Sequence, residues 1–334
     1  MSVKIACDFC YHNCLLSEGQ LGLCKVRKNQ EGKIVTIGYG QIVASAMDPI
    51  EKKPMYHLLP GAKTYSIALF GCNYSCLFCQ NHTISQPEGP YYNTLFNGSY
   101  FNETSVEELI AAVVASKSPI VSYTYSDPIV WQDYMLEAAR LAHSHNLLNC
   151  MVTNGSFSKK SLERVIDVID AFNIDVKGDE HFYKKYCKGS LEPVLEGIEK
   201  IASTKNRVLE VTTLLIEDLQ SLSEIKFLAK QLSERGVEVW HLSRFFPHYK
   251  MRDLNSTSEE FMIEAINIAK DAKINYVYAG NSFLENDYPT VCPTCKSILI
   301  KGHSYRGEAK SEAQKNIKGG RCFNCNGEIY GLFS

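Results

Sequence analysis

The residues of this chain best suited to chemistry are three cysteines on one short segment, with the spacing C-x3-C-x2-C: Cys72, Cys76 and Cys79. The apolar run at 65–70 predicts a buried strand just before them, so the cysteines should lie on the loop at its carboxyl end, where α/β folds place catalytic groups. Cysteine thiolates hold iron–sulfur clusters. Three ligands would leave one iron of a four-iron cluster open to a substrate or cofactor. The spacing alone leaves a zinc site and unligated core cysteines as alternatives.

Eight further cysteines form two quartets, Cys7, Cys10, Cys14 and Cys24, and Cys292, Cys295, Cys322 and Cys325. Clustered C-x2-C pairs in a chain without a secretory signal indicate metal sites rather than disulfides. Four thiolates are the closed ligand set of structural zinc. We therefore expect zinc in a zinc-ribbon or rubredoxin-like C-terminal module, with mononuclear iron as the alternative. Four ligands also suggest a closed zinc site at the N-terminal quartet, where the irregular gaps leave an auxiliary iron–sulfur cluster and free thiols as the alternatives.

The elements that position these cysteines follow from the apolar pattern. Strands are expected at 65–70, 119–125, 147–152, 171–176, 207–214 and 237–242, with a candidate seventh at 275–279. Capping boxes predict three helix starts, at Ser105-x-x-Glu108, Ser221-x-x-Glu224 and Thr257-x-x-Glu260. Strands that alternate with helices indicate a parallel sheet covered by helices.

Three segments lie outside this alternation. Residues 33–45 predict a small hairpin around Gly38-Tyr39-Gly40, and residues 46–64 predict a solvated connector. Residues 84–104 are polar and aromatic without a period, which indicates either a lid over the site or a mobile surface loop. Of the two remaining cysteines, Cys150 is expected in the core and Cys187 receives no role.

The cysteine segment resembles a known family. Cys72-x3-Cys76-x2-Cys79, with Phe78 before the last cysteine, is similar to the motif of radical S-adenosylmethionine (SAM) enzymes, and Gln80-Asn81 after it resembles the pyruvate formate-lyase activating enzyme-like branch. With the upstream segment 48–54, DPIEKKP, the chain most resembles the radical SAM enzymes of the AmmeMemoRadiSam system. This resemblance covers most of residues 1–285. It implies a partial (β/α)6 TIM-type barrel at 61–285, after a cysteine-rich module and connector at 1–60. The cysteine spacing itself places the zinc-ribbon or rubredoxin-like module at 286–334.

The resemblance also implies which residues bind SAM, all at strand ends or in the cysteine loop: Phe78, Tyr125, Ser126, Asp127, Thr153, Asn154, Asp175, Val176, Lys177 and His241. Thr124–Asp127 occupies the place of a Gly-Gly-Glu motif in the related activating enzymes, from which this sequence departs. An ordinary helix cap at Asp127 and a surface pair of Asp175 and Lys177 are the non-functional alternatives. Arg244 is a candidate partner for a substrate carboxylate or phosphate because its guanidinium suits bidentate contact.

The resemblance implies a reaction as well. A reduced [4Fe-4S] cluster passes one electron to SAM, which breaks into methionine and a 5′-deoxyadenosyl radical, and the radical abstracts hydrogen from a protein glycine or a small molecule. A flavodoxin- or ferredoxin-type protein would supply the electron. The alternative from another class is a non-catalytic iron–sulfur and zinc scaffold for redox or assembly.

The composition argues against several other classes of protein, namely nucleic-acid-binding, membrane-spanning and secreted proteins. Hydrophobic residues make up 45% of the 334 residues, enough for one large domain with small appendages. The 35 basic and 37 acidic side chains nearly balance, so a nucleic-acid partner is not favoured. No apolar run reaches the roughly 20 residues of a membrane helix, and the first residues lack an apolar signal region. A cytoplasmic location is therefore expected.

Overall fold

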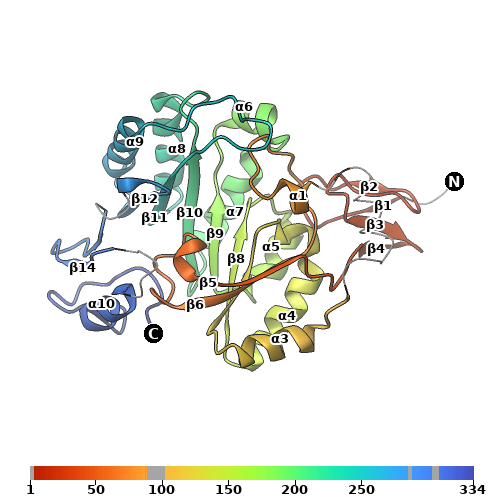
Figure 1. The fold of residues 1–334 in the computed structure, drawn as a ribbon, viewed down its shortest axis with the longest axis horizontal. Helices are drawn as coiled ribbons and strands as arrows, with labels where there is room; N and C mark the ends of the chain where they lie inside the picture. The colour runs from red at the N-terminus through yellow and green to blue at the C-terminus, as the bar shows by residue number, and fades with distance from the viewer. Residues whose placement is uncertain (1–3, 87, 89–101, 285–287, 303–307) are drawn as a thin grey trace.

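The computed structural model describes residues 4–86, 88, 102–284, 288–302 and 308–334, and its centre is an eight-stranded sheet (Figure 1). Seven strands run parallel, each beside its predecessor in the chain, and β5 pairs antiparallel with β6 at the edge. The strands are β5 (Ala44–Pro49), β6 (Lys63–Ala68), β7 (Ile120–Tyr123), β8 (Leu148–Thr153), β9 (Ala171–Asp175), β10 (Val208–Leu215), β11 (Val239–Arg244) and β12 (Tyr276–Gly280).

Helices connect the parallel strands and pack on the outer face of the sheet (Figure 1). The longer ones are α3 (Val106–Ala115), α4 (Gln132–Ser144), α5 (Lys159–Ile166), α7 (Glu192–Ala202), α8 (Leu222–Glu234) and α9 (Glu259–Asp271). Short turns of helix lie at α1 (His82–Ser85), η1 (Ile50–Lys52), η2 (Pro128–Trp131), α6 (Glu180–Phe182) and η3 (Tyr183–Cys187). This is the expected α/β architecture of a partial barrel, with seven parallel strands instead of six because the candidate strand near 275–279 forms as β12.

Two of the three predicted capping boxes are confirmed. Ser105 and Glu108 at the start of α3, and Ser221 and Glu224 at the start of α8, each make both reciprocal hydrogen bonds. The third prediction is wrong by one residue, because Ser258 caps α9. The Thr257 hydroxyl instead donates a hydrogen bond to the Leu215 carbonyl, which ties the start of α9 to the end of β10.

The connector at 46–64 is not a solvated linker. Its first residues form β5, and Asp48, Glu51 and Lys53 are buried. Lys53 Nζ lies 2.7 Å from Asp48 Oδ2, and this pairing compensates both charges, so the segment can enter the protein interior. The connector thus completes the sheet edge, and β5 lies inside the range 1–60 that the sequence suggested as a separate module.

The N-terminal module contains two small hairpins, β1 (Ile5–Ala6) with β2 (Leu15–Leu16) and β3 (Arg27–Gln30) with β4 (Lys33–Thr36). The hairpin predicted at 33–45 is therefore misplaced, because the chain reverses at Glu31-Gly32, both with positive φ. Arg27 fixes the module to the barrel. It is 1% exposed and donates hydrogen bonds of 2.7 and 3.0 Å to the Asp133 carboxylate on α4.

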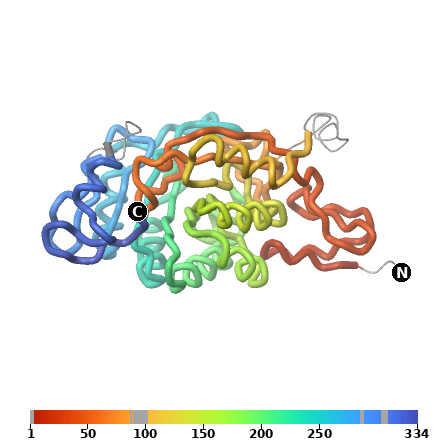
Figure 2. The backbone as a smooth tube through the Cα atoms, turned by 90° about the horizontal axis from the view of Figure 1, so that it is seen from below, coloured from red at the N-terminus to blue at the C-terminus, as the bar shows by residue number. Residues whose placement is uncertain are grey.

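The C-terminal module lies at the opposite end of the barrel from the N-terminal one (Figure 2). It comprises β13 (Thr290–Val291), β14 (Ile298–Ile300), α10 (Glu308–Asn316), β15 (Ile317–Lys318) and β16 (Arg321–Cys322). Its own small core is formed by Leu299, Ile300, Ala309, Ala313, Ile317 and Ile329. The following segment reaches the barrel, where the Tyr330 hydroxyl accepts a 2.6 Å hydrogen bond from the Leu209 amide.

Among the residues that the structure describes, no helix is long and apolar enough to cross a bilayer. The predicted lid or mobile loop at 84–104 falls largely on residues 87 and 89–101, which lie outside the described residues.

Candidate active site at the cysteine loop

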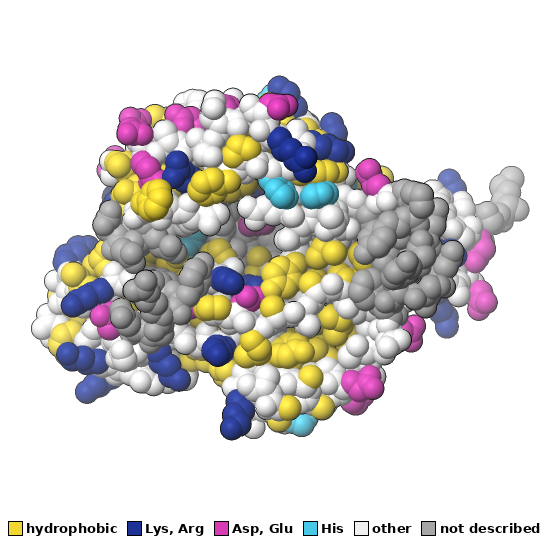
Figure 3. Space-filling model, in the orientation of Figure 1, with side chains coloured by type: hydrophobic (Ala, Val, Ile, Leu, Met, Phe, Trp, Pro, Cys, Tyr) yellow, Lys and Arg dark blue, Asp and Glu magenta, His cyan; other side chains and the backbone are white. Residues whose placement is uncertain are grey.

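A cavity of about 440 Å³ opens at the carboxyl ends of the parallel strands, and Figure 3 shows a hollow in the centre of this face. The cysteine loop lies on one side of it and η1 on another. Its lining includes Cys72, Cys76 and Cys79, residues that follow or end β7, β8 and β9, and Thr212, Leu214, Ser243 and Asn281 from the last three strands. The fold therefore gathers residues from the whole sheet around the three cysteines.

Backbone hydrogen bonds hold the cysteine loop in place. The amides of Ser75 and Leu77 donate to the carbonyls of Cys187 and Tyr186 in η3, at 2.8 and 3.0 Å. On the other side, the Asn81 side-chain amide donates to the Tyr125 carbonyl at 2.8 Å. A loop fixed at several points keeps its ligand atoms positioned before a metal binds.

The chemistry of the three thiols fits a cationic metal centre. Burial raises the pKa of Cys79 to about 11 and that of Cys72 well above its ordinary value. The pKa of Cys76 is also raised well above its ordinary value, first by a hydrogen bond with Cys187 and then by burial. These thiols would stay neutral without a cation, whereas a bound metal deprotonates its thiol ligands. The Tyr74 amide and the Asn154 side-chain amide, 3.4 and 3.6 Å from Cys72 Sγ, can then donate to the thiolate.

The turn after β7 combines an uncommon backbone conformation with a buried acid. Tyr125 has φ 65°, which is uncommon for a non-glycine residue, and its hydroxyl donates to Asp48 at 2.5 Å. Asp127 caps η2 by accepting a hydrogen bond from the Ile129 amide, so it is the helix cap that the non-functional alternative predicted. It also lines the cavity. It accepts hydrogen bonds from the Thr153 hydroxyl and the Asn154 amide, and burial raises its pKa to about 6.

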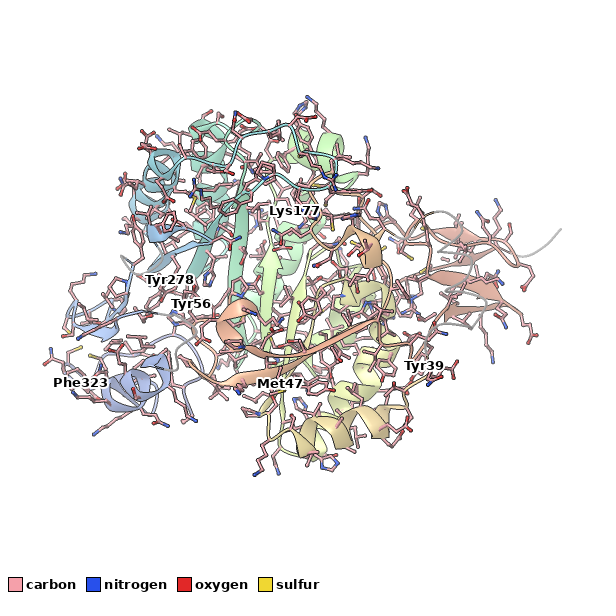
Figure 4. All side chains as sticks on the ribbon, viewed as in Figure 1. Tyr39, Met47, Tyr56, Lys177, Tyr278 and Phe323 are labelled. Carbon is pink, nitrogen blue, oxygen red and sulfur yellow. The ribbon has the colours of Figure 1, made fainter. Side chains whose placement is uncertain are left out.

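Asp175 and Lys177, after β9, form an ion pair on the cavity wall. Their charged atoms are 3.0 Å apart, and both residues line the cavity, so the pair belongs to the cavity wall although the Asp175 side chain is 38% exposed. Burial alone would lower the pKa of Lys177, but Asp175 and the thiols of Cys76 and Cys187 raise it well above its ordinary value. Lys177 therefore stays cationic near the centre of the molecule, where Figure 4 labels it.

Nine of the ten residues expected at SAM line this one cavity: Phe78, Tyr125, Ser126, Asp127, Thr153, Asn154, Asp175, Val176 and Lys177. The tenth, His241, is 2% exposed, is absent from the lining and contacts Glu210 instead. Its predicted contact with the ribose or adenine has no support in this geometry. Arg244 is likewise engaged elsewhere, because its guanidinium lies 2.8 Å from Glu259.

Lys52 and Lys53 are cavity residues that the sequence reasoning did not find. Lys53 pairs with Asp48 and lies over the Tyr125 ring, with Nζ 4.2 Å from the ring centroid. The sequence does show a run of charged residues between Pro49 and Pro54. That these residues reach the cavity could not be predicted, because Tyr125, with which they pack, is more than 70 residues away in the sequence.

The C-terminal cysteines form a second, separate site. Cys292, Cys295, Cys322 and Cys325 place their sulfur atoms within 4.8 Å of one another. The amides of Asn324 and Gly327 lie 3.4 Å from Cys322 Sγ and Cys325 Sγ, as donors to thiolates do. Hydrogen bonding with Ser297 lowers the pKa of Cys295 to about 5. This arrangement fits a tetrahedral metal ion.

The comparisons with known proteins match the same part of the chain that forms the cavity. The Radical SAM superfamily pattern matches residues 67–229, a span that contains the three cysteines of the loop and the strands from β7 to β10. The chain belongs to the radical SAM superfamily. Radical SAM enzymes cleave SAM reductively at a [4Fe-4S] cluster, and this chain is such an enzyme.

Relatives place this radical SAM enzyme within the superfamily only broadly. An uncharacterized protein of Methanocaldococcus jannaschii is 35% identical over 332 residues, covering 98% of this chain and 95% of the relative. A putative glycyl-radical enzyme activating enzyme of the same organism is 23% identical over 218 residues, covering 64% of this chain and 77% of that protein, which is a distant similarity. Streptococcus suis SuiB bound to S-adenosylmethionine has the same fold, with a TM-score of 0.50 at 12% identity over 73% of this chain and 55% of SuiB.

Proposed function

We propose that this radical SAM enzyme is an activating enzyme-like member of the AmmeMemoRadiSam type, which abstracts hydrogen from a substrate bound in the cavity at the cysteine loop. The observation that carries this proposal is the single cavity shared by the three cysteines and nine of the residues expected at SAM. The DPIEKKP segment supports the subgroup, because it lies beside the cavity through Lys52 and Lys53.

Different residues of the cavity would hold the cluster, bind SAM and orient the cysteine loop. Cys72, Cys76 and Cys79 would hold the [4Fe-4S] cluster. When bound, the cluster supplies the electron that cleaves SAM to methionine and a 5′-deoxyadenosyl radical. Asp175 and Lys177 offer opposite charges to the carboxylate and amino groups of the methionine moiety and to the ribose hydroxyls. Asn154 would orient the loop through Cys72 and Asn73, since it hydrogen-bonds both.

The substrate would enter from the side of η1. On that side Lys52, Lys53 and Tyr125 line the cavity. Ser243 and Asn281 line its opposite side, near the other edge of the sheet. A small molecule and a glycine-bearing polypeptide are both compatible with these polar walls. A flavodoxin- or ferredoxin-type donor would supply the electron, and no nucleic acid or membrane partner is proposed.

Anaerobic turnover with deuterated candidate substrates tests this function. Transfer of deuterium into 5′-deoxyadenosine identifies the substrate and establishes hydrogen abstraction. Lys53→Met, compared with the exposed Lys160→Met as a matched control, should lower deuterium transfer while SAM cleavage without substrate persists. SAM cleavage that never transfers deuterium from any protein or small molecule of the host would contradict the proposal and favour a scaffold function.

The C-terminal quartet would hold structural zinc. Its sulfur separations of 3.6 Å between Cys292 and Cys325, and 3.8 Å between Cys295 and Cys322, match the edges of a tetrahedron with Zn–S bonds of about 2.3 Å. The site is closed and lies on the opposite side of the barrel from the N-terminal module (Figure 2). It would stabilise the module and take no part in bond breaking.

A further inference from the structure

The N-terminal cysteine quartet lies directly behind the catalytic cysteine loop. Gly71, the residue before Cys72, has φ 102° and approaches Val26 and the Cys24 carbonyl so closely that a Cβ there would lie 2.7 Å from the Val26 methyls and 3.3 Å from that oxygen. A second contact joins the two parts, because the His12 ring lies 3.2 Å from the Asn73 carbonyl oxygen, one residue after Cys72. The two cysteine-bearing segments therefore pack back to back.

A hydrogen-bonded path connects one quartet member to a catalytic cysteine. The side chain of Asn73 hydrogen-bonds the Cys10 thiol. The Asn154 side-chain amide donates to Asn73 Oδ1 at 2.8 Å and lies 3.6 Å from Cys72 Sγ. Two asparagine side chains thus span the whole gap between Cys10 and Cys72.

The four N-terminal cysteines lie in one small part of the module. The Cys7 amide donates to the Cys14 carbonyl at 2.9 Å, so these two residues are neighbours. Cys7, Cys10 and Cys24 are at most 7% exposed and Cys14 is half-buried, so three of the four possible ligands are shielded from solvent.

The spacing of the sulfur atoms distinguishes this quartet from the zinc-type site. In the described part of the chain, only the C-terminal cysteines bring three or more sulfur atoms within 4.8 Å of one another. The N-terminal set and the catalytic set of Cys72, Cys76 and Cys79 are both wider. A zinc ion binds every thiolate itself, which forces the sulfur atoms together. In a cubane each thiolate binds a different iron, so the sulfur atoms stay farther apart.

We infer that Cys7, Cys10, Cys14 and Cys24 hold a second iron–sulfur cluster, placed to exchange one electron with the catalytic cluster. This replaces the earlier expectation of zinc at these residues. The electron would come from a low-potential one-electron donor of the ferredoxin or flavodoxin class. It would reduce the N-terminal cluster by one electron and then pass to the catalytic cluster, which oxidises the first again. No proton or bond change accompanies this transfer.

Removal of the catalytic ligands tests the second cluster without relying on activity. The full-length Cys72→Ala/Cys76→Ala/Cys79→Ala variant is purified anaerobically and reconstituted with iron and sulfide. We expect about four irons and one zinc per chain in this variant, against about eight irons and one zinc in the wild type. After dithionite reduction, the variant should still show the electron paramagnetic resonance (EPR) signal of a reduced cluster.

The complementary variant keeps the test decisive if the first does not fold. Cys10→Ser/Cys24→Ser should retain about four irons, with an EPR signal that changes when SAM is added. In the wild type, two reduced clusters this close should broaden each other's signals, so its spectrum should differ from the sum of the two variants. About four irons and two zincs in the wild type, with no iron–sulfur signal from the catalytic-loop variant, would overturn the inference. Those results would leave the proposed function intact, since SAM cleavage depends on the other three cysteines.

Discussion

The imidazole of His241 lies 2.6 Å from the carboxylate of Glu210, and both side chains are buried inside the barrel. The same carboxylate accepts the backbone amides of Tyr56 and His57 at 3.0 and 2.8 Å. His241 is therefore one of three donors that satisfy a buried acid. The pair joins β10 and β11 to the segment after η1. Near it Tyr56 and Tyr278 lie together, with ring centroids 4.8 Å apart (Figure 4).

This relationship predicts a stability effect for His241. His241→Ala should lower the free energy of unfolding by about 1–3 kcal/mol, because it leaves the Glu210 carboxylate short of one buried donor. Affinity for SAM should change less than about twofold. Denaturant unfolding and SAM titration under anaerobic conditions measure the two effects. A variant of wild-type stability with strongly weakened SAM binding would instead restore His241 as a contact of the nucleoside.

The ion pair on the cavity wall predicts the opposite pattern. Asp175→Asn and Lys177→Met should each weaken SAM affinity by roughly tenfold, about 1.4 kcal/mol, while cluster iron stays near the wild-type content. Asp167→Asn, on an exposed residue at the end of α5, is the matched control. If both cavity variants bind SAM as the control does, the assignment of these two residues is wrong.

Glu51 predicts how stability depends on pH. Burial raises the pKa of its carboxyl to about 7, although the Gly61 amide donates to it. The folded state therefore binds the proton more tightly than the unfolded state does. The stabilising contribution is complete below about pH 4.5 and is lost as the pH rises to about 7.

Glu51→Gln should remove this dependence, because the amide keeps an acceptor for Gly61 but does not titrate. Relative to wild type, the variant should gain roughly 1–3 kcal/mol of stability between pH 5 and pH 8. Unfolding midpoints at the two pH values measure this gain, with the exposed Glu163→Gln as control. Parallel pH profiles for wild type and Glu51→Gln would contradict the raised pKa.

The C-terminal site predicts stabilisation without catalysis. Cys322→Ala should lose about one zinc per chain and lower the thermal midpoint, because folding of small metal modules depends on their ion. SAM cleavage should continue, since the cavity contains none of these four cysteines. Zinc analysis and 5′-deoxyadenosine formation at a temperature below the new midpoint measure both effects. Loss of SAM cleavage by a folded variant would assign this site a catalytic role.

Local patterns were enough to predict much of the fold. The apolar runs located all seven parallel strands, and the capping boxes at Ser105 and Ser221 located two helix starts, because both signals lie within a few neighbouring residues. Predictions failed where partners are distant in sequence. Asp48 and Lys53 looked solvent-exposed because nothing nearby indicates that they neutralise each other beside Tyr125.

The same distinction applies to the site. The cysteine spacing and the polar strand ends predicted which residues meet at one cavity, since parallel strands end at one edge of the sheet. His241 and Tyr278 also belong to β11 and β12, but their partners Glu210 and His57 direct them to the interior instead of the cavity. Which of two buried environments a strand residue enters depends on the other strands, and its own sequence neighbours do not determine it.

The central claim is that the cluster cleaving SAM is held by Cys72, Cys76 and Cys79. The most direct measurement is 5′-deoxyadenosine formation from SAM by anaerobically reduced protein, for wild type, Cys76→Ala and the control Cys150→Ala. Cys150 is buried in β8 and absent from the cavity lining, so its substitution should leave cleavage near the wild-type rate. We expect no cleavage above background for Cys76→Ala. Cleavage at the wild-type rate by that variant would contradict the account.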